Sequence, residues 1–258
     1  MTTDVMRPEK LDIGRVIQTT FTSLQRNFVR LLPLIGIFIV LPGAFTLISS
    51  LSRGSVFAPG YVASPLYFAN LVVGLFAWAA FQGAGILILV SDMRGETLSV
   101  GDSVRRSLVH ILPLFAIVIL YFLAVWAGSI LLLVPGVMIA VAFSVAIQAR
   151  VVERKGVFAA FGRSRFLTRG NRWRITGLIL VYVIFLGVIE MVIVSLFGGF
   201  AGLARNLDRG AAVSLSVILQ ILGLAFGLIG LAGSCSLYAE LRRIKDGVGA
   251  SDLAAVFD

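Results

Sequence analysis

Three polar residues set in otherwise apolar stretches are the first candidates for chemistry. Glu190 is the only acidic residue inside such a stretch, and Asn70 and Gln220 lie in two others. An ionisable group surrounded by hydrocarbon is costly and marks a functional-site hypothesis by default. Glu190, Gln220 and Asn70 therefore form a candidate intramembrane polar cluster. Three interpretations are open: structural hydrogen bonding, transport coupled to protons or cations, and a carboxylate that reaches the nearest surface.

A second candidate is the cationic segment 150–174, which holds eight basic residues. Basic residues close to an anionic membrane surface each contribute about 1 kcal/mol of attraction. We expect Arg163, Arg165 and Arg169 to contact lipid phosphates. Bulky neighbours would set the depth of this surface helix: Phe158, Phe161, Leu167 and Trp173. The alternative is that these arginines only determine the orientation of the chain.

Motifs for enzymatic chemistry are missing from the sequence. It has one histidine, His110, and one cysteine, Cys235, and no Ser/His/acid set, zinc spacing, Walker loop or dinucleotide fingerprint. We therefore predict a non-enzymatic protein with no catalytic residue, metal ion, cofactor or internal disulfide. His110 is expected to be a residue of the membrane boundary.

Composition places these residues in a membrane protein. The 258 residues are 59% hydrophobic, whereas soluble domains have about 45–50%, and the mean hydropathy is +1.00. A helix crosses a bilayer with about 20 apolar residues. We predict an all-α integral membrane bundle of six transmembrane helices in a single polytopic domain, 1–258. The expected spans are about 31–51, 66–90, 111–134, 135–150, 175–197 and 211–237.

The third and fourth spans are inferred from one long apolar run. No charged residue occurs between Ile111 and Ala149, which is nearly twice the length of one crossing. Val134-Pro135-Gly136 is the expected reversal, because Pro lacks a backbone donor and Gly tolerates a tight turn. A re-entrant loop is the rival for the short fourth segment. It would give five crossings and place the eight basic residues of 150–174 outside.

The basic residues predict the orientation. Nineteen of the 22 Lys and Arg residues fall in the two termini and in alternate loops, and the remaining three are Arg53, Arg205 and Arg209. Cytoplasmic loops carry the Lys/Arg excess, so both termini are expected in the cytoplasm. This bias explains the net charge of +9 without nucleic acid, which is not an expected partner.

A weak internal repeat predicts how the spans are organised. Residues 23–34 (SLQRNFVRLLPL) match residues 103–114 (SVRRSLVHILPL), and a looser third copy lies around 169–178. Each copy precedes an odd-numbered span. The expected unit is an interfacial amphipathic helix, an elbow and a helical hairpin, repeated three times. In 12–28 the helix would be capped by Asp12 and would place its apolar face in the membrane or against the bundle.

Four segments carry a resemblance to a known family: ERKGVFAAFGRSRFLTRGNRWRI (153–175), LLLVPG (131–136), DIGRVIQTTFTSLQRNFVRLLPL (12–34) and YAELRRIKDG (238–247). Together they resemble the bacterial glycerophosphoryl diester phosphodiesterase membrane domain. That name comes from larger proteins in which such a membrane region is joined to a catalytic domain, for which this sequence leaves no room. The resemblance implies a multi-pass protein of the inner membrane without an established molecular activity.

We therefore expect a non-enzymatic inner-membrane protein that organises or senses its lipid environment or supports another membrane protein. Its expected partners are membrane lipids, anionic at the cytoplasmic leaflet, together with a membrane-protein partner or further copies of the chain. The alternative is a transporter of small solutes or lipids that uses the polar groups near Glu190.

Overall fold

The computed structural model describes residues 10–40, 42–44, 65–197, 199 and 209–247, and this part of the chain is helical without strands. Six of its helical segments are long and apolar enough to cross a membrane, which confirms the predicted all-α fold class. The elements are α1 (Ile13–Ile35), the π-helix η1 (Gly36–Val40), α3 (Pro65–Met93), α4 (Val100–Val109), α5 (Ile111–Leu131), α6 (Leu133–Ala142), α7 (Ala146–Glu153), α8 (Val157–Thr168), α9 (Arg172–Leu196) and α11 (Arg209–Asp246).

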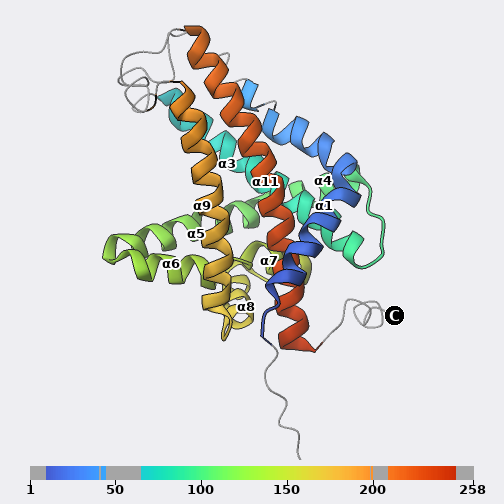
Figure 1. The fold of residues 1–258 in the computed structure, drawn as a ribbon. Coiled ribbons are helices and arrows are strands. Elements are labelled where there is room, and N and C mark those ends of the chain that lie inside the picture. Colours follow the sequence, from blue (N-terminus) through green and yellow to red (C-terminus); the bar gives the residue numbers. More distant parts are fainter. Residues whose placement is uncertain (1–9, 41, 45–64, 198, 200–208, 248–258) are drawn as a thin grey trace, which may run out of the picture.

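The helices are not arranged as one set of parallel rods. In Figure 1, α9 runs upward and α11 runs back downward, whereas the α5–α6 hairpin extends to the left at a steep angle to them. The main core cluster lies where these elements meet, with buried side chains from α1, α5, α7, α8 and α11. In α9 only Ile175 is buried. Most of α9 therefore presents apolar side chains outward, as expected of a helix that faces lipid.

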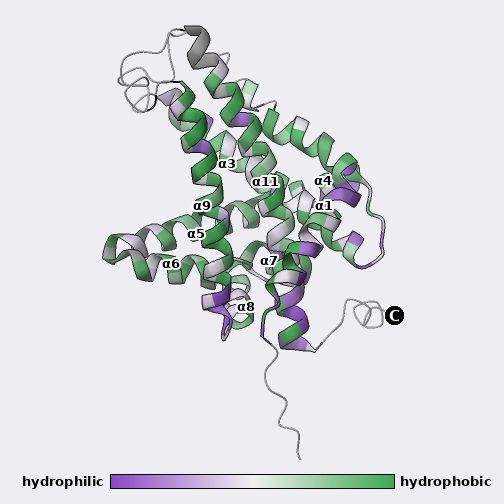
Figure 2. Cartoon of the chain, viewed as in Figure 1, coloured by the Kyte–Doolittle hydropathy of each residue, from purple (hydrophilic) through white to green (hydrophobic). Residues whose placement is uncertain are grey.

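The basic segments gather at one end of the molecule. Arg94, Arg106 and Arg150 line one pocket, and α8 packs against the C-terminal part of α11. We call this region the arginine-rich end; its members are Arg15, Arg26, Arg94, Arg106, Arg150, Arg154, Arg163, Arg165, Arg169, Arg172, Arg174, Arg242 and Arg243. Figure 2 shows the same separation, with hydrophilic residues concentrated on α8 and the end of α11. These segments thus lie near one another in the structure, and their common side of the membrane stays a prediction.

Helix α1 corrects the expected elbow in the first repeat unit. Asp12 caps its start as predicted, accepting a hydrogen bond from the Arg15 amide. The helix then continues through Pro33, so the predicted elbow before the first span is wrong. Its buried residues form one stripe with three- and four-residue spacing along the whole length: Val16, Thr20, Ser23, Asn27, Leu31 and Leu34. A break would interrupt this packing against α3 and α11.

One flank of α1 is apolar and exposed. Ile17, Phe21 and Phe28 are each about half exposed, on a flank about 100° of helical rotation from the buried stripe. Thr20, Ser23 and Asn27 are buried instead, and the Thr20 and Asn27 side chains donate to the backbone carbonyls of Val16 and Ser23. The amphipathic helix thus places small polar side chains against the bundle and large apolar ones outward, which suits a membrane boundary.

The second and third units have the expected elbows. Helix α4 begins at a Ser99 cap and ends at His110, immediately before α5. Helix α8 ends at Arg169, and α9 begins after a turn in which Gly170 has a φ of 90°. Only glycine adopts such a conformation without strain. Both surface helices are therefore separate from the spans that follow them.

The hairpin reverses two residues earlier than predicted. Helix α5 is followed by Leu132 in an extended conformation, and Pro135 lies in the first turn of α6, where its missing donor is not needed. Gly136 serves the packing of the two helices instead of the turn. A Cβ atom added there would lie 3.0 Å from both the Cα and the backbone N of Ser129.

The fourth span, predicted as a continuous helix over 135–150, is broken into α6 and α7 at residues 143–145. Ser164 of α8 supports the break. Its hydroxyl donates to the carbonyl of Ala142 over 2.8 Å and accepts from the amide of Val145 over 3.3 Å. A helix interruption within a membrane protein is stable only when its backbone groups find partners, and α8 supplies them.

Candidate functional site

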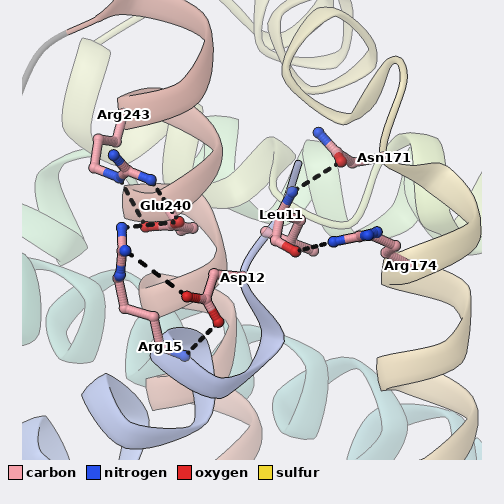
Figure 3. Close-up of polar contacts among 7 residues, drawn as sticks. All are labelled: Leu11, Asp12, Arg15, Asn171, Arg174, Glu240 and Arg243. Atoms are coloured by element: carbon pink, nitrogen blue, oxygen red, sulfur yellow. Dashed lines mark hydrogen bonds and ion pairs between the residues drawn. The ribbon is translucent and has the colours of Figure 1, made fainter. Parts of the chain in front are cut away.

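The N-terminal end of α1 is tied to two distant helices (Figure 3). Leu11 is fully buried; its amide donates to Asn171 over 3.0 Å, and its carbonyl accepts from Arg174 over 2.7 Å. Glu240 of α11 is buried and accepts from Arg15 over 3.4 Å and from Arg243 over 3.0 Å. Because these contacts join α1, α9 and α11, they fix the framework on which the cationic segment is carried.

Arg163 points inward and is paired within the protein. Its Nε donates to Glu153 over 2.9 Å, and its guanidinium also pairs with Asp246 at the end of α11. Glu153 receives two further contacts, from the Tyr238 hydroxyl over 2.8 Å and from Lys155 over 3.2 Å. Burial disfavours the charged guanidinium, but the bonds to Asp246 and Glu153 outweigh it and raise the pKa of Arg163. Through these two contacts, Arg163 joins α8 to α7 and α11.

Arg165 and Arg169 are exposed, unlike Arg163. Together with Arg172 they line a surface hollow of about 470 Å³, whose remaining lining residues are Gly162 and Phe166. The Nε atom of Arg172 is buried and has no hydrogen-bond partner among the described residues. We call this feature the arginine hollow. Three guanidinium groups on one concave surface match the geometry of a phosphate group, which arginine binds through paired hydrogen bonds.

One aromatic side chain, Phe166, lines the arginine hollow, and two others are exposed on the helices that form it, α8 and α9. Phe158 is 82% exposed, Trp173 is 78% exposed and Phe166 is about half exposed. Large aromatic side chains are rarely left so open to water, and they are favoured at membrane interfaces. Lys245 of α11 lies 5.9 Å from the centre of the Phe166 ring. The combination of exposed aromatics and exposed arginines has the composition of a surface that rests on lipid headgroups.

Two members of the predicted intramembrane cluster are brought together. Asn70 of α3 and Gln220 of α11 both line a pocket of about 350 Å³ far from the arginine hollow. The Asn70 amide nitrogen is buried and has no hydrogen-bond partner among the described residues. Gly43 also lines this pocket, and a Cβ atom added there would overlap the Gln220 amide. The pocket therefore has an unsatisfied donor in an apolar setting.

Glu190 is placed apart from this pair. It lies on α9, is half-buried, and does not line the pocket of Asn70 and Gln220. The contact between α9 and α11 is made instead by Tyr182, whose hydroxyl donates to the Phe226 carbonyl over 2.7 Å. The predicted three-residue cluster is thus a pair plus a separate carboxylate.

Three carboxylates that organise the arginine-rich end were not predicted from the sequence: Glu153, Glu240 and Asp246. The sequence does contain a sign of their role, because each carboxylate lies within three residues of a basic residue near the end of an apolar stretch. Which arginine each one pairs with depends on the tertiary fold. No group of three His, Cys, Asp or Glu side chains in the described part of the chain is placed to hold a metal ion.

Comparison with known proteins supports the membrane assignment and little beyond it. The chain is 34% identical over 86 residues to a UPF0259 membrane protein of Pectobacterium carotovorum subsp. carotovorum, a match that covers 33% of this chain and 34% of that protein. No family model and no solved structure matches the chain. The resemblance to the glycerophosphoryl diester phosphodiesterase membrane domain stays a prediction. Together with the six apolar helices, the comparison identifies a multi-pass integral membrane protein.

Proposed function

We propose that this chain is a non-enzymatic protein of the bacterial inner membrane that organises or senses anionic lipid at the cytoplasmic leaflet, with both termini in the cytoplasm. In this role it would act alone, with further copies of itself, or in support of another membrane protein. The proposal includes membership of the glycerophosphoryl diester phosphodiesterase membrane domain family. It involves no nucleic acid and no cofactor.

The arginine hollow is the observation that carries this proposal. Arg165 and Arg169 are exposed and share the hollow with the half-exposed Phe166. Phe158 and Trp173 are exposed on α8 and α9, so charge and interfacial anchors occur on the same two helices. Attraction to an anionic leaflet is electrostatic and falls off within a Debye length. Arg163 is left out of the proposed lipid contacts because its guanidinium is already paired with Glu153 and Asp246.

The double substitution Arg165→Gln/Arg169→Gln tests this role. We expect its affinity for short-chain phosphatidylglycerol to be about 10- to 30-fold weaker at low salt, since each arginine contributes about 1 kcal/mol. The measurement is a titration of the purified full-length protein in neutral detergent, repeated with phosphatidylcholine and at raised salt. Binding of phosphatidylcholine should be unaffected.

The matched control is Arg26→Gln/Arg105→Gln, which removes the same charge from two exposed positions outside the arginine hollow. It should retain most of the phosphatidylglycerol affinity. If both double variants lose the same affinity, attraction is spread over the whole arginine-rich end and the hollow has no special role. If neither variant changes binding, lipid sensing through these arginines is wrong.

A second candidate function is favoured by the pocket of Asn70 and Gln220. A pocket of about 350 Å³ with an unpartnered amide donor is a polar feature within apolar helices, and such features mark transport pathways. In this reading the protein transports a small solute or a lipid. Because Glu190 does not line the pocket, its carboxylate would have to act from α9 as a separate proton-carrying group.

Proton flux into proteoliposomes discriminates between the two functions. A transporter coupled through Glu190 should acidify the vesicle interior under an applied gradient. Glu190→Gln should abolish this flux while leaving the unfolding temperature unchanged, and Ser195→Ala on the same helix should keep it. A wild-type protein without flux, or a Glu190→Gln variant with full flux, would exclude coupling through this carboxylate.

A further inference from the structure

A second cationic pocket lies between α3, α4 and α7, at a different place from the arginine hollow. Its volume is about 460 Å³, within the range of small-ligand sites. The basic residues in its lining come from three separate segments of the chain: Arg94, Arg106, His110, Arg150 and Arg154. Glu96 is the one carboxylate among its described lining residues. The pocket therefore concentrates positive charge in a partly enclosed space.

Two of these arginines have buried nitrogens without a partner. The Nε atoms of Arg94 and Arg150 are both inaccessible and form no hydrogen bond with any described residue. Within the described part of the chain, none of the four arginines is ion-paired with a carboxylate. Leaving a buried charged donor unsatisfied is costly, so two such donors lining one pocket point to a missing anion.

Apart from Glu96, which lines the pocket itself, two nearby acids are engaged elsewhere. Glu153 is held by Arg163, Lys155 and Tyr238 on the side of α8 and α11, and Asp102 accepts from the Ser99 hydroxyl at the start of α4. The Ser107 hydroxyl in the pocket wall donates to the Ala80 carbonyl. The guanidinium groups and His110 therefore remain as the donors available to a ligand.

The backbone at Arg154 is consistent with a built site. This residue follows α7 with φ 51° and ψ 27°, in the left-handed region, and it is the one non-glycine residue of the described chain with a positive φ. Such conformations are unfavourable for residues with a Cβ and cluster at binding sites. Because the backbone changes direction at Arg154, the Glu153 side chain stays paired with Arg163 while the side chain of Arg154 lines the pocket.

We propose that this pocket binds one phosphate-bearing anion. Several arginines suit the three oxygens of a phosphate better than a single carboxylate, because each guanidinium offers a planar pair of donors. Part of the wall is apolar, formed by Leu87, Leu98 and Leu114, so the ligand is either a free phosphate compound or the headgroup of a phospholipid. The proposal does not depend on lipid binding at Arg165 and Arg169.

The test uses the full-length protein in neutral detergent with two probes, inorganic phosphate and short-chain phosphatidylglycerol. Wild-type protein should bind at least one of them with a rise in unfolding temperature. Arg150→Gln and Arg154→Gln should each weaken that binding at least about tenfold; Arg154 is exposed, so its variant stays informative if Arg150→Gln does not fold. Arg105→Gln, outside the pocket, should change nothing.

The two probes separate the sources of the phosphate group. Stabilisation by inorganic phosphate indicates a free phosphate ligand, whereas stabilisation by the lipid alone, retained at high phosphate, indicates a headgroup. Arg165→Gln/Arg169→Gln should leave this binding unchanged, which separates it from the proposed function. The proposal is overturned if neither probe binds, or if the Arg150 and Arg154 variants bind as tightly as wild type.

Discussion

Gly136→Val is expected to destabilise the protein strongly, as is a substitution at Gly128, the other glycine of the α5–α6 hairpin. An added Cβ at Gly136 would meet the backbone of Ser129 at 3.0 Å, and one at Gly128 would lie 3.1 Å from the Cα atom of Gly136. Backbone atoms cannot rotate away as a side chain can, so the two helices must separate. Overpacking of this kind costs typically about 1–3 kcal/mol.

Thermal unfolding of the purified protein in detergent measures this effect, and Gly177→Val is the matched control. Gly177 lies in α9, where an added Cβ would meet nothing within 4 Å, and the loss of a helical glycine is itself favourable. Gly136→Val should therefore unfold several degrees below wild type, while Gly177→Val unfolds at the same temperature or slightly above it. Equal stability of the two variants would refute the close contact between α5 and α6.

Single cysteines on opposite sides of the membrane should label in an all-or-none manner. Cysteines at Ser55 and Asn206 are expected to react with an impermeant thiol reagent in intact cells, because the loops that contain them are poor in basic residues. Cysteines at Thr97 and Gly156 should react only after permeabilisation. Both belong to the arginine-rich side, and both are exposed.

These positions are chosen to leave the fold intact. Gly95 lies in the same loop as Thr97, and Gly170 in the turn between α8 and α9, but their φ values of 77° and 90° would strain any side chain. Gly156 has a φ of −59° and open space for a Cβ. The native Cys235 is fully buried and should contribute no background. Labelling of the Gly156 cysteine from outside intact cells would reverse the proposed orientation.

Hydropathy predicted the six apolar helices because exposing polar backbone groups to lipid is costly, and an apolar segment avoids that cost by forming a helix. Breaks within them were less predictable. The interruption at 143–145 depends on Ser164, a residue from another helix that satisfies the freed backbone groups. Likewise, Leu-Pro-Leu lies inside α1 in one copy and in the first turn of α5 in another. The local sequence is the same, and the packing of α1 along α11 makes the difference.

The side-chain contacts of the candidate sites were also not predictable from the local sequence. Arg163 and Arg165 are two residues apart and equally basic, yet the first is paired with Glu153 and the second is exposed. Composition predicts a cationic helix and cannot say which of its faces meets a carboxylate from α7 or α11. Similarly, spacing along α9 placed Glu190 at a plausible depth, but the helix turns Tyr182, not Glu190, toward α11. The pocket of Arg94 and Arg150 joins distant segments that no local pattern connects.

Helix α9 is packed into the core of the protein at its first turn, through Ile175. This side chain, in the first turn, is the one buried residue of a 25-residue helix, whose length is about 37 Å. The hydrocarbon core of a bilayer is about 30 Å thick, and a longer helix accommodates the difference by tilting. Beyond its first turn, α9 is held to α11 by the hydrogen bond from Tyr182 to the Phe226 carbonyl. A thinner or thicker bilayer would therefore act on the part of α9 that follows Tyr182, while the core at the first turn stays intact.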